Sequence, residues 1–143
     1  MKSRFLIALA MLGAAMLWCS GTSGQMAPTP LLKVDVPFEF VAGGMNLPAG
    51  SYDVLHIMNP NWILLRSSDG RAIAVLSVQV SSSSAKASST RLVFNQYGQK
   101  YFLAQVWTEN DNQVHTCFKS SAERVLASRS QRPPQVATVY PKP

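Results

Sequence analysis

The sequence contains few of the residues from which reactive centres are built. Among its 143 residues there are two cysteines, two histidines and seven acidic side chains. If Cys19 leaves with the N-terminal segment described below, Cys117 is the single thiol and no intramolecular disulfide can form. Cys117 has no cation beside it before Lys119, so we expect a small, partly buried hydrophobe and not a reactive thiolate.

Recognised motifs of catalysis and cofactor binding are also missing. No Gly-x-Ser-x-Gly elbow is present to activate one of the serines. The pair Gly43-Gly44 precedes an expected strand and has no P-loop lysine, which argues against phosphate binding. His56 and His115 have no cysteine or carboxylate at ligand spacing, so they make a weak zinc site. We therefore predict no catalytic residue, no cofactor and no metal.

The longest apolar run is too short to cross a membrane as a helix. It covers residues 5–18, whereas a span needs roughly 20 apolar residues. Lys2 and Arg4 precede the run and small residues follow it, which is the pattern of a secretory signal peptide. We predict a signal peptide at 1–24 and a secreted or periplasmic protein. Lipidation of Cys19 is a minor alternative, because a bulky tryptophan precedes this cysteine.

The net charge of +6 is unevenly distributed along the chain. Basic and acidic side chains cancel within residues 25–118, whereas residues 119–143 hold five basic residues and one acidic residue. Because the expected folded part is neutral, the charge does not predict nucleic-acid binding. We expect residues 128–143 to form a flexible, basic, proline-containing tail. Such a tail makes at most a weak, salt-sensitive contact with an anionic membrane surface.

Short apolar runs separated by turn residues make up the rest of the sequence. Turns such as Asn59-Pro60-Asn61 and Asn110-Asp111-Asn112 are of the kind that join antiparallel neighbours. With no long helical pattern between them, about seven such runs predict an all-β fold, an antiparallel β-sandwich or barrel. A linker at 25–30 precedes the domain, for which we predict the bounds 31–127. The expected strands are 31–41, 51–58, 62–66, 72–80, 91–95, 101–108 and 114–118.

The C-terminal part of the sequence adds one helix. Ser120 to Ala127 is the only convincing helical segment, because Glu123 follows Ser120 at the spacing of a capping box. Further on, Val136 to Tyr140 alternates well enough to act as an added edge strand, which is the alternative to a flexible tail. The strand expected at 72–80 has apolar residues on both faces, which predicts a covering layer on each side.

Four segments stand out by their residues and their order along the chain: "DVPFEFVAGGMNLPAGSYDV", "LLRSSDGRA", "LVFNQYGQKYFLAQVW" and "SSAERVLA". Together they resemble a functionally uncharacterised family of small exported bacterial β proteins. The resemblance covers most of residues 34–127 and implies no activity. The chain departs from the family pattern at Asn95-Gln96, where a histidine-arginine pair is expected, and at Cys117-Phe118, where a leucine-proline pair is expected. Any chemistry of that histidine in relatives is absent here.

Aromatic residues give the best functional lead. Trp62, Tyr101 and Trp107 could form an exposed platform for a sugar or a peptide, since Trp and Tyr combine an apolar face with a polar edge. Filling the interior of a sheet is the alternative use of such residues. Strict alternation along 101–108 places Tyr101 and Trp107 on one face of the strand.

We therefore expect a non-catalytic binding or envelope-accessory protein whose partner is an envelope protein or a glycan. Its oligomeric state does not follow from the sequence. The rival class is a small exported hydrolase that uses His56 or His115 with a turn aspartate, and this class requires a histidine and a carboxylate in one concave site. A purely structural surface protein is the third alternative.

Overall fold

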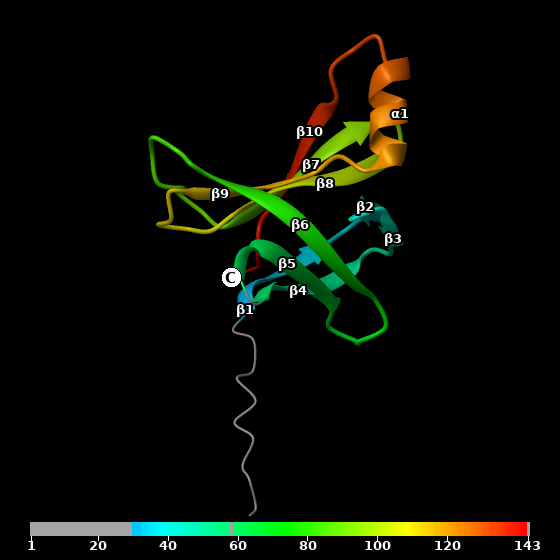
Figure 1. Cartoon of the computed structure of the whole chain (residues 1–143). Helices are drawn as coiled ribbons and strands as arrows, with labels where there is room; N and C mark the ends of the chain where they lie inside the picture. The colour runs from blue at the N-terminus through cyan, green and yellow to red at the C-terminus, as the bar shows by residue number, and fades with distance from the viewer. Residues whose placement is uncertain (1–29, 58, 143) are drawn as a thin grey trace, which may run out of the picture.

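The computed structural model describes residues 30–57 and 59–142, which form ten strands and one helix (Figure 1). The predicted all-β fold with one short C-terminal helix is confirmed. The strand count exceeds the expected seven because the region 31–41 divides near Pro37 and two further short strands form. The elements are β1 (Pro30–Val36), β2 (Phe40–Ala42), β3 (Met45–Leu47), β4 (Gly50–Ile57), β5 (Asn59–Ser67), β6 (Ile73–Ser82), β7 (Arg91–Tyr97), β8 (Lys100–Trp107), β9 (Gln113–Cys117), α1 (Ser121–Arg129) and β10 (Gln135–Val139).

The strands form one mixed, mostly antiparallel, open sheet. Its order is β1-β4-β5-β6-β9-β8-β2-β3, while β7 pairs with β8 and β10 pairs with β7. The long strand β6 joins two halves, since its residues 73–77 pair with β5 and its residues 78–82 pair with β9. Figure 1 shows β1, β4 and β5 below β6 and the group β7 to β10 above it. The sheet therefore folds over into two layers.

The hydrophobic core fills the space between these layers. Alternation along each strand turns one set of side chains inward, and these side chains are almost fully buried. The ring of Phe40 packs edge-on against both Tyr52 and Phe94, with ring centroids 5.3 Å apart in each pair. Complete burial of one such side chain contributes about 1.5–3 kcal/mol. The most buried members include Val34, Phe40, Tyr52, Val54, Ile63, Leu65, Leu92, Phe94 and Val106.

The hairpin of β2 and β3 brings a glycine turn against β6. Gly43 and Gly44 both have positive φ angles, +58° and +83°, which side-chain-bearing residues rarely adopt. A Cβ at Gly43 would also lie 3.0 Å from the carbonyl oxygen of Val75, so the turn or β6 would have to move slightly to accept a side chain. After β3, the Tyr52 hydroxyl donates a hydrogen bond to the carbonyl of Pro48 and fixes the turn that leads into β4.

The helix α1 is held by its cap and by one buried carboxylate. Ser120 is the N-cap residue, and its hydroxyl accepts a hydrogen bond from the backbone N–H of Glu123 at 3.2 Å. The Glu123 side chain is buried and accepts a hydrogen bond from Nδ2 of Asn95 on β7 at 2.8 Å. This contact attaches the first turn of α1 to the sheet.

The C-terminal segment is not the flexible tail that its composition predicted. Residues 135–139 form β10, which pairs antiparallel with β7. Ala137 and Val139 pack against the core, and Lys142 Nζ lies 3.3 Å from Asp35 Oδ2 on β1. The domain boundary at residue 127 and the flexible tail 128–143 are therefore wrong. The alternative edge strand formed instead, because it pairs with the otherwise open edge of β7.

The signal peptide predicted at 1–24, the lipidation site Cys19 and the linker up to residue 29 lie outside the described residues. Pro30, which was assigned to the linker, is the first residue of β1. Within 30–57 and 59–142, no helix has the length and apolar character that crossing a membrane requires.

Candidate functional site

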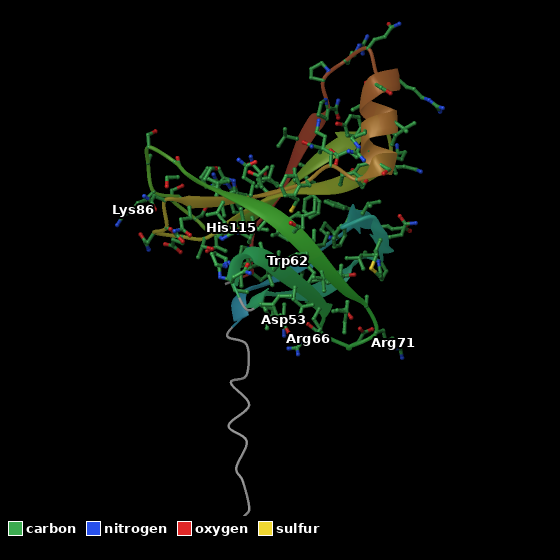
Figure 2. All side chains as sticks on the ribbon, viewed as in Figure 1. Asp53, Trp62, Arg66, Arg71, Lys86 and His115 are labelled. Atoms are coloured by element: carbon green, nitrogen blue, oxygen red, sulfur yellow. The ribbon has the colours of Figure 1, made fainter. Side chains whose placement is uncertain are left out.

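The outer face of β5 and β6 exposes large apolar side chains. Because Ile63 and Leu76 point into the core, the neighbouring residues on each strand point outward. The exposed fraction is 43% for Trp62 and 48% for both Ile73 and Val75. Figure 2 shows Trp62 on β5, next to the paired strand β6. Of the two covering layers predicted for this strand, only the one on the inner face of β6 is therefore present.

A groove of about 460 Å³ opens beside Trp62. It is lined by Trp62 of β5, by Val75, Leu76 and Ser77 of β6, and by the segment from Cys117 into α1. The Gly43-Gly44 turn also lines it. We call this site the Trp62 groove, and its volume lies in the range typical of ligand sites.

Two cations without acidic partners belong to the Trp62 groove. Lys119 and Arg124 both line it, and no ion pair reaches either side chain within the described residues. Arg124 Nη2 donates to the hydroxyl of Ser121 at 3.2 Å, which leaves its charge uncompensated. The neighbouring carboxylate of Glu123 is buried and accepts a hydrogen bond from Asn95, and no ion pair joins it to either cation. The groove therefore combines apolar walls with net positive charge.

Cys117 lies at the floor of the Trp62 groove and is not a reactive group. It is a buried free cysteine, and burial raises the pKa of its thiol to about 12. The thiolate is therefore nearly absent at neutral pH, so the expectation of a small buried hydrophobe is confirmed.

The structure brings the two histidines together. His56 on β4 and His115 on β9 point toward each other, and their Nε2 atoms lie 3.1 Å apart. Burial lowers the pKa of both imidazoles, so each is neutral at pH 7 and one Nε2–H donates to the other. No carboxylate is hydrogen-bonded to either ring within the described residues, although the negative charge of Asp111 acts to raise the pKa of both. No group of three metal-binding side chains occurs there either.

The three predicted aromatic residues do not form one platform. Tyr101 stacks on Phe38 with ring centroids 3.9 Å apart and packs against the core. Trp107 is on the opposite face of β8, where the Arg91 guanidinium lies 4.5 Å from its ring centroid. Of the three, only Trp62 belongs to the groove.

A β-bulge separates Tyr101 from Trp107. Leu103 pairs with Phe94 and Gln105 pairs with Val93, so Ala104 is an extra residue in β8. The extra residue reverses the alternation, and Trp107 faces outward although Tyr101 faces inward.

The sequence reasoning also missed Phe118, Lys119 and Arg124. Phe118 has an exposed fraction of 62%, and the available signal was its place between the buried Cys117 and the polar cap Ser120. Because adjacent residues in an extended chain point to opposite sides, the residue that follows the buried Cys117 points outward.

Comparison of the chain with protein-family models, with curated protein sequences and with solved structures gives no match.

Proposed function

We propose that this is an exported, non-catalytic binding protein, and that the Trp62 groove holds its ligand. The observation that carries the proposal is the joint exposure of Trp62 and Phe118 beside the uncompensated charges of Lys119 and Arg124. An exposed tryptophan stacks on apolar or sugar surfaces, and unpaired cations bind carboxylates. The preferred ligand therefore combines an apolar surface with an anionic group.

The exported location is supported by the pattern of residues 1–24, in which two cations precede an apolar run and small residues follow it. We expect the protein outside the cytoplasm, with a mature N-terminus near Gln25. N-terminal sequencing of the protein from its native type of host checks this, and recovery of an intact Met1 in the envelope fraction contradicts it.

The histidine pair does not carry an alternative proposal. A hydrolase would need a carboxylate hydrogen-bonded to one imidazole to orient it, and within the described residues no such bond reaches His56 or His115, although the charge of Asp111 acts on both rings. Access to the pair is also limited, since the exposed fraction of His115 is 1% and His56 is partly buried.

Calorimetric titration with two anionic probes tests the binding proposal. The probes are an oligogalacturonate, as an acidic glycan, and a short acidic peptide that also carries valines. At least one should bind, and Trp62→Ala should weaken that binding about tenfold or more, as stacking contributes on the order of 1–3 kcal/mol in comparable sites. Trp107→Ala is the matched control, because Trp107 lies outside the groove. Absence of binding, or equal losses in both variants, contradicts the proposal.

A further inference from the structure

The exposed apolar surface around Trp62 is wider than the Trp62 groove. Paired residues of an antiparallel sheet point to the same face, and Ile73 and Val75 lie on the outer face of β6, beside Trp62 on β5. Ile73 lies outside the groove, yet its side chain is about half exposed. Phe118 lines the groove from the segment between β9 and α1 and is largely exposed. We call Trp62, Ile73, Val75 and Phe118 the Trp62 face, which extends from the groove onto the outer surface of the sheet.

Positive charge is in excess beside the Trp62 face. Lys119 and Arg124 line the groove, and no ion pair within the described residues reaches either side chain. Asp53 also points outward from the sheet, but its carboxylate lies 3.5 Å from Nη2 of Arg66 and is balanced by it. Figure 2 shows Asp53 and Arg66 below Trp62. An anionic surface is therefore attracted to this side of the molecule.

A peptide cannot add to β6 as a further strand in this region. The Gly43-Gly44 turn packs against that edge, since a Cβ at Gly43 would lie 3.0 Å from the carbonyl oxygen of Val75. A ligand must therefore be recognised by side chains. Tryptophan favours the boundary between hydrocarbon and water, and lysine and arginine carry their charge at the end of an apolar stem. Such side chains suit a surface in which anionic groups lie above apolar chains, which is the surface of a lipid bilayer.

We propose that the Trp62 face docks on the surface of an anionic lipid bilayer. Trp62 and Phe118 enter the boundary between headgroups and acyl chains, and Lys119 and Arg124 pair with lipid phosphates. Binding of this kind grows with the apolar area buried and with the attraction to anionic lipid, so both sets of residues contribute. The inference depends on the proposed function, since the bilayer supplies the apolar surface and the anionic group for the same groove.

Flotation of the full mature protein with lipid vesicles measures the docking. Vesicles of mixed phosphatidylcholine and phosphatidylglycerol should bind the protein about tenfold or more tightly than vesicles of phosphatidylcholine alone, because only the mixed vesicles carry net negative charge. High salt should weaken the binding to the mixed vesicles, since it screens the attraction between exposed charges. Equal binding to both kinds of vesicle overturns the role of the cations and with it the inference.

Two valine substitutions compare the Trp62 face with another exposed part of the sheet. Val75 and Val136 are both exposed strand residues, and Val136 is on β10, outside the Trp62 face. Val75→Ala should weaken binding to the mixed vesicles several-fold, whereas Val136→Ala should leave it unchanged. Phe118→Ala removes more apolar surface and should weaken binding about tenfold or more. Equal effects of the two valine substitutions contradict docking through this face.

Two charge reversals separate the groove from the basic C-terminal segment. Lys119→Glu and Arg132→Glu change the net charge equally, and both side chains are exposed, so the fold should survive each substitution. Lys119→Glu should weaken vesicle binding about tenfold or more, and Arg132→Glu about twofold or less. Equal losses would mean that net charge or the C-terminal segment attracts the vesicle, which overturns the inference.

Fluorescence locates Trp62 in the bilayer. Trp62 and Trp107 are the only tryptophans in residues 25–143, so Trp107→Phe leaves Trp62 as the single reporter in the mature protein. With mixed vesicles, the emission of Trp62 should shift to shorter wavelength, and phospholipids with brominated acyl chains should quench it. Trp62→Phe is the matched control, since Trp107 lies outside the Trp62 groove and should not be quenched.

Each remaining outcome overturns a defined part of the argument. Vesicle binding without quenching of Trp62 overturns docking through the Trp62 face. Binding of the oligogalacturonate or the acidic peptide, with no binding to vesicles, overturns the inference and leaves the proposed function intact. Absence of binding to the vesicles and to both soluble probes overturns the inference and the proposed function together.

Discussion

Over residues 73–76 the two faces of β6 have similar side chains and different surroundings. Ala74, Leu76 and Val78 face the core and are nearly fully buried, whereas Ile73 and Val75 on the other face are about half exposed. Over residues 73–76 local hydrophobicity does not separate the two faces, and the outer face becomes polar only from Ser77 onward. The difference shows that apolar alternation identifies a strand but does not identify which face is covered, and that an uncovered apolar face beside unpaired charge is a candidate for binding.

Removal of β10 should have the largest effect on stability. A chain that ends at Arg132 loses the ladder between residues 135–139 and β7 and the packing of Ala137 and Val139 on the core. With each net hydrogen bond contributing about 0.5–1.5 kcal/mol, the free energy of unfolding should fall on the order of 3–5 kcal/mol. Urea denaturation followed by circular dichroism measures the change.

A chain that ends at Tyr140 is the matched control for this truncation. It keeps β10 and loses only the exposed pair between Lys142 and Asp35, so its stability should equal that of the full chain. If the chain ending at Arg132 is as stable as the full chain, the C-terminal tail is dispensable for the fold.

The inner and outer faces of β6 can be compared directly with two alanine substitutions that remove side chains of similar size. Leu76→Ala leaves a cavity in the core and should lower the free energy of unfolding by about 2–4 kcal/mol. Ile73→Ala, on the exposed face, should lower it by about 1 kcal/mol or less. A similar loss for both variants in chemical denaturation would mean that the outer face is covered in solution, for instance by a second molecule.

Much of this architecture could be predicted from local sequence, and the part that could not depends on partners far along the chain. Alternation predicted the central strands, and Ser120 with Glu123 predicted α1. The bulge at Ala104 has no local signature, so strict alternation placed Trp107 on the wrong face. The groove depends on where β5 stops pairing with β6 and where β9 begins, and no single strand carries that information.

Protonation of the histidine pair at acid pH should lower the stability of the fold. Burial holds the pKa of His56 and His115 below the ordinary value of 6.5, with Asp111 acting in the opposite direction. Because the unfolded chain then binds more protons, stability should be complete above about pH 6.5 and fall as pH drops toward the folded-state pKa values.

The measurement for the histidine pair is the melting temperature between pH 7.5 and pH 5. The double variant His56→Gln, His115→Gln should show a smaller decrease than the parent over this range, because it has no imidazole to protonate. Equal slopes for the two proteins would show that the acid sensitivity lies elsewhere.

The smallest effect on stability should come from the residue with the largest effect on binding. Trp62 is on the outer face of β5 opposite Ser77, and 43% of its surface is exposed, so it contributes little to the core. Trp62→Ala should therefore change the free energy of unfolding by about 1 kcal/mol or less while it removes most of the affinity for the acidic peptide. Denaturation and calorimetric titration of the same preparation test both halves. If the variant instead unfolds as easily as Leu76→Ala, Trp62 is part of the packed fold, and the exposed face of β5 and β6 is a structural surface and not a ligand site.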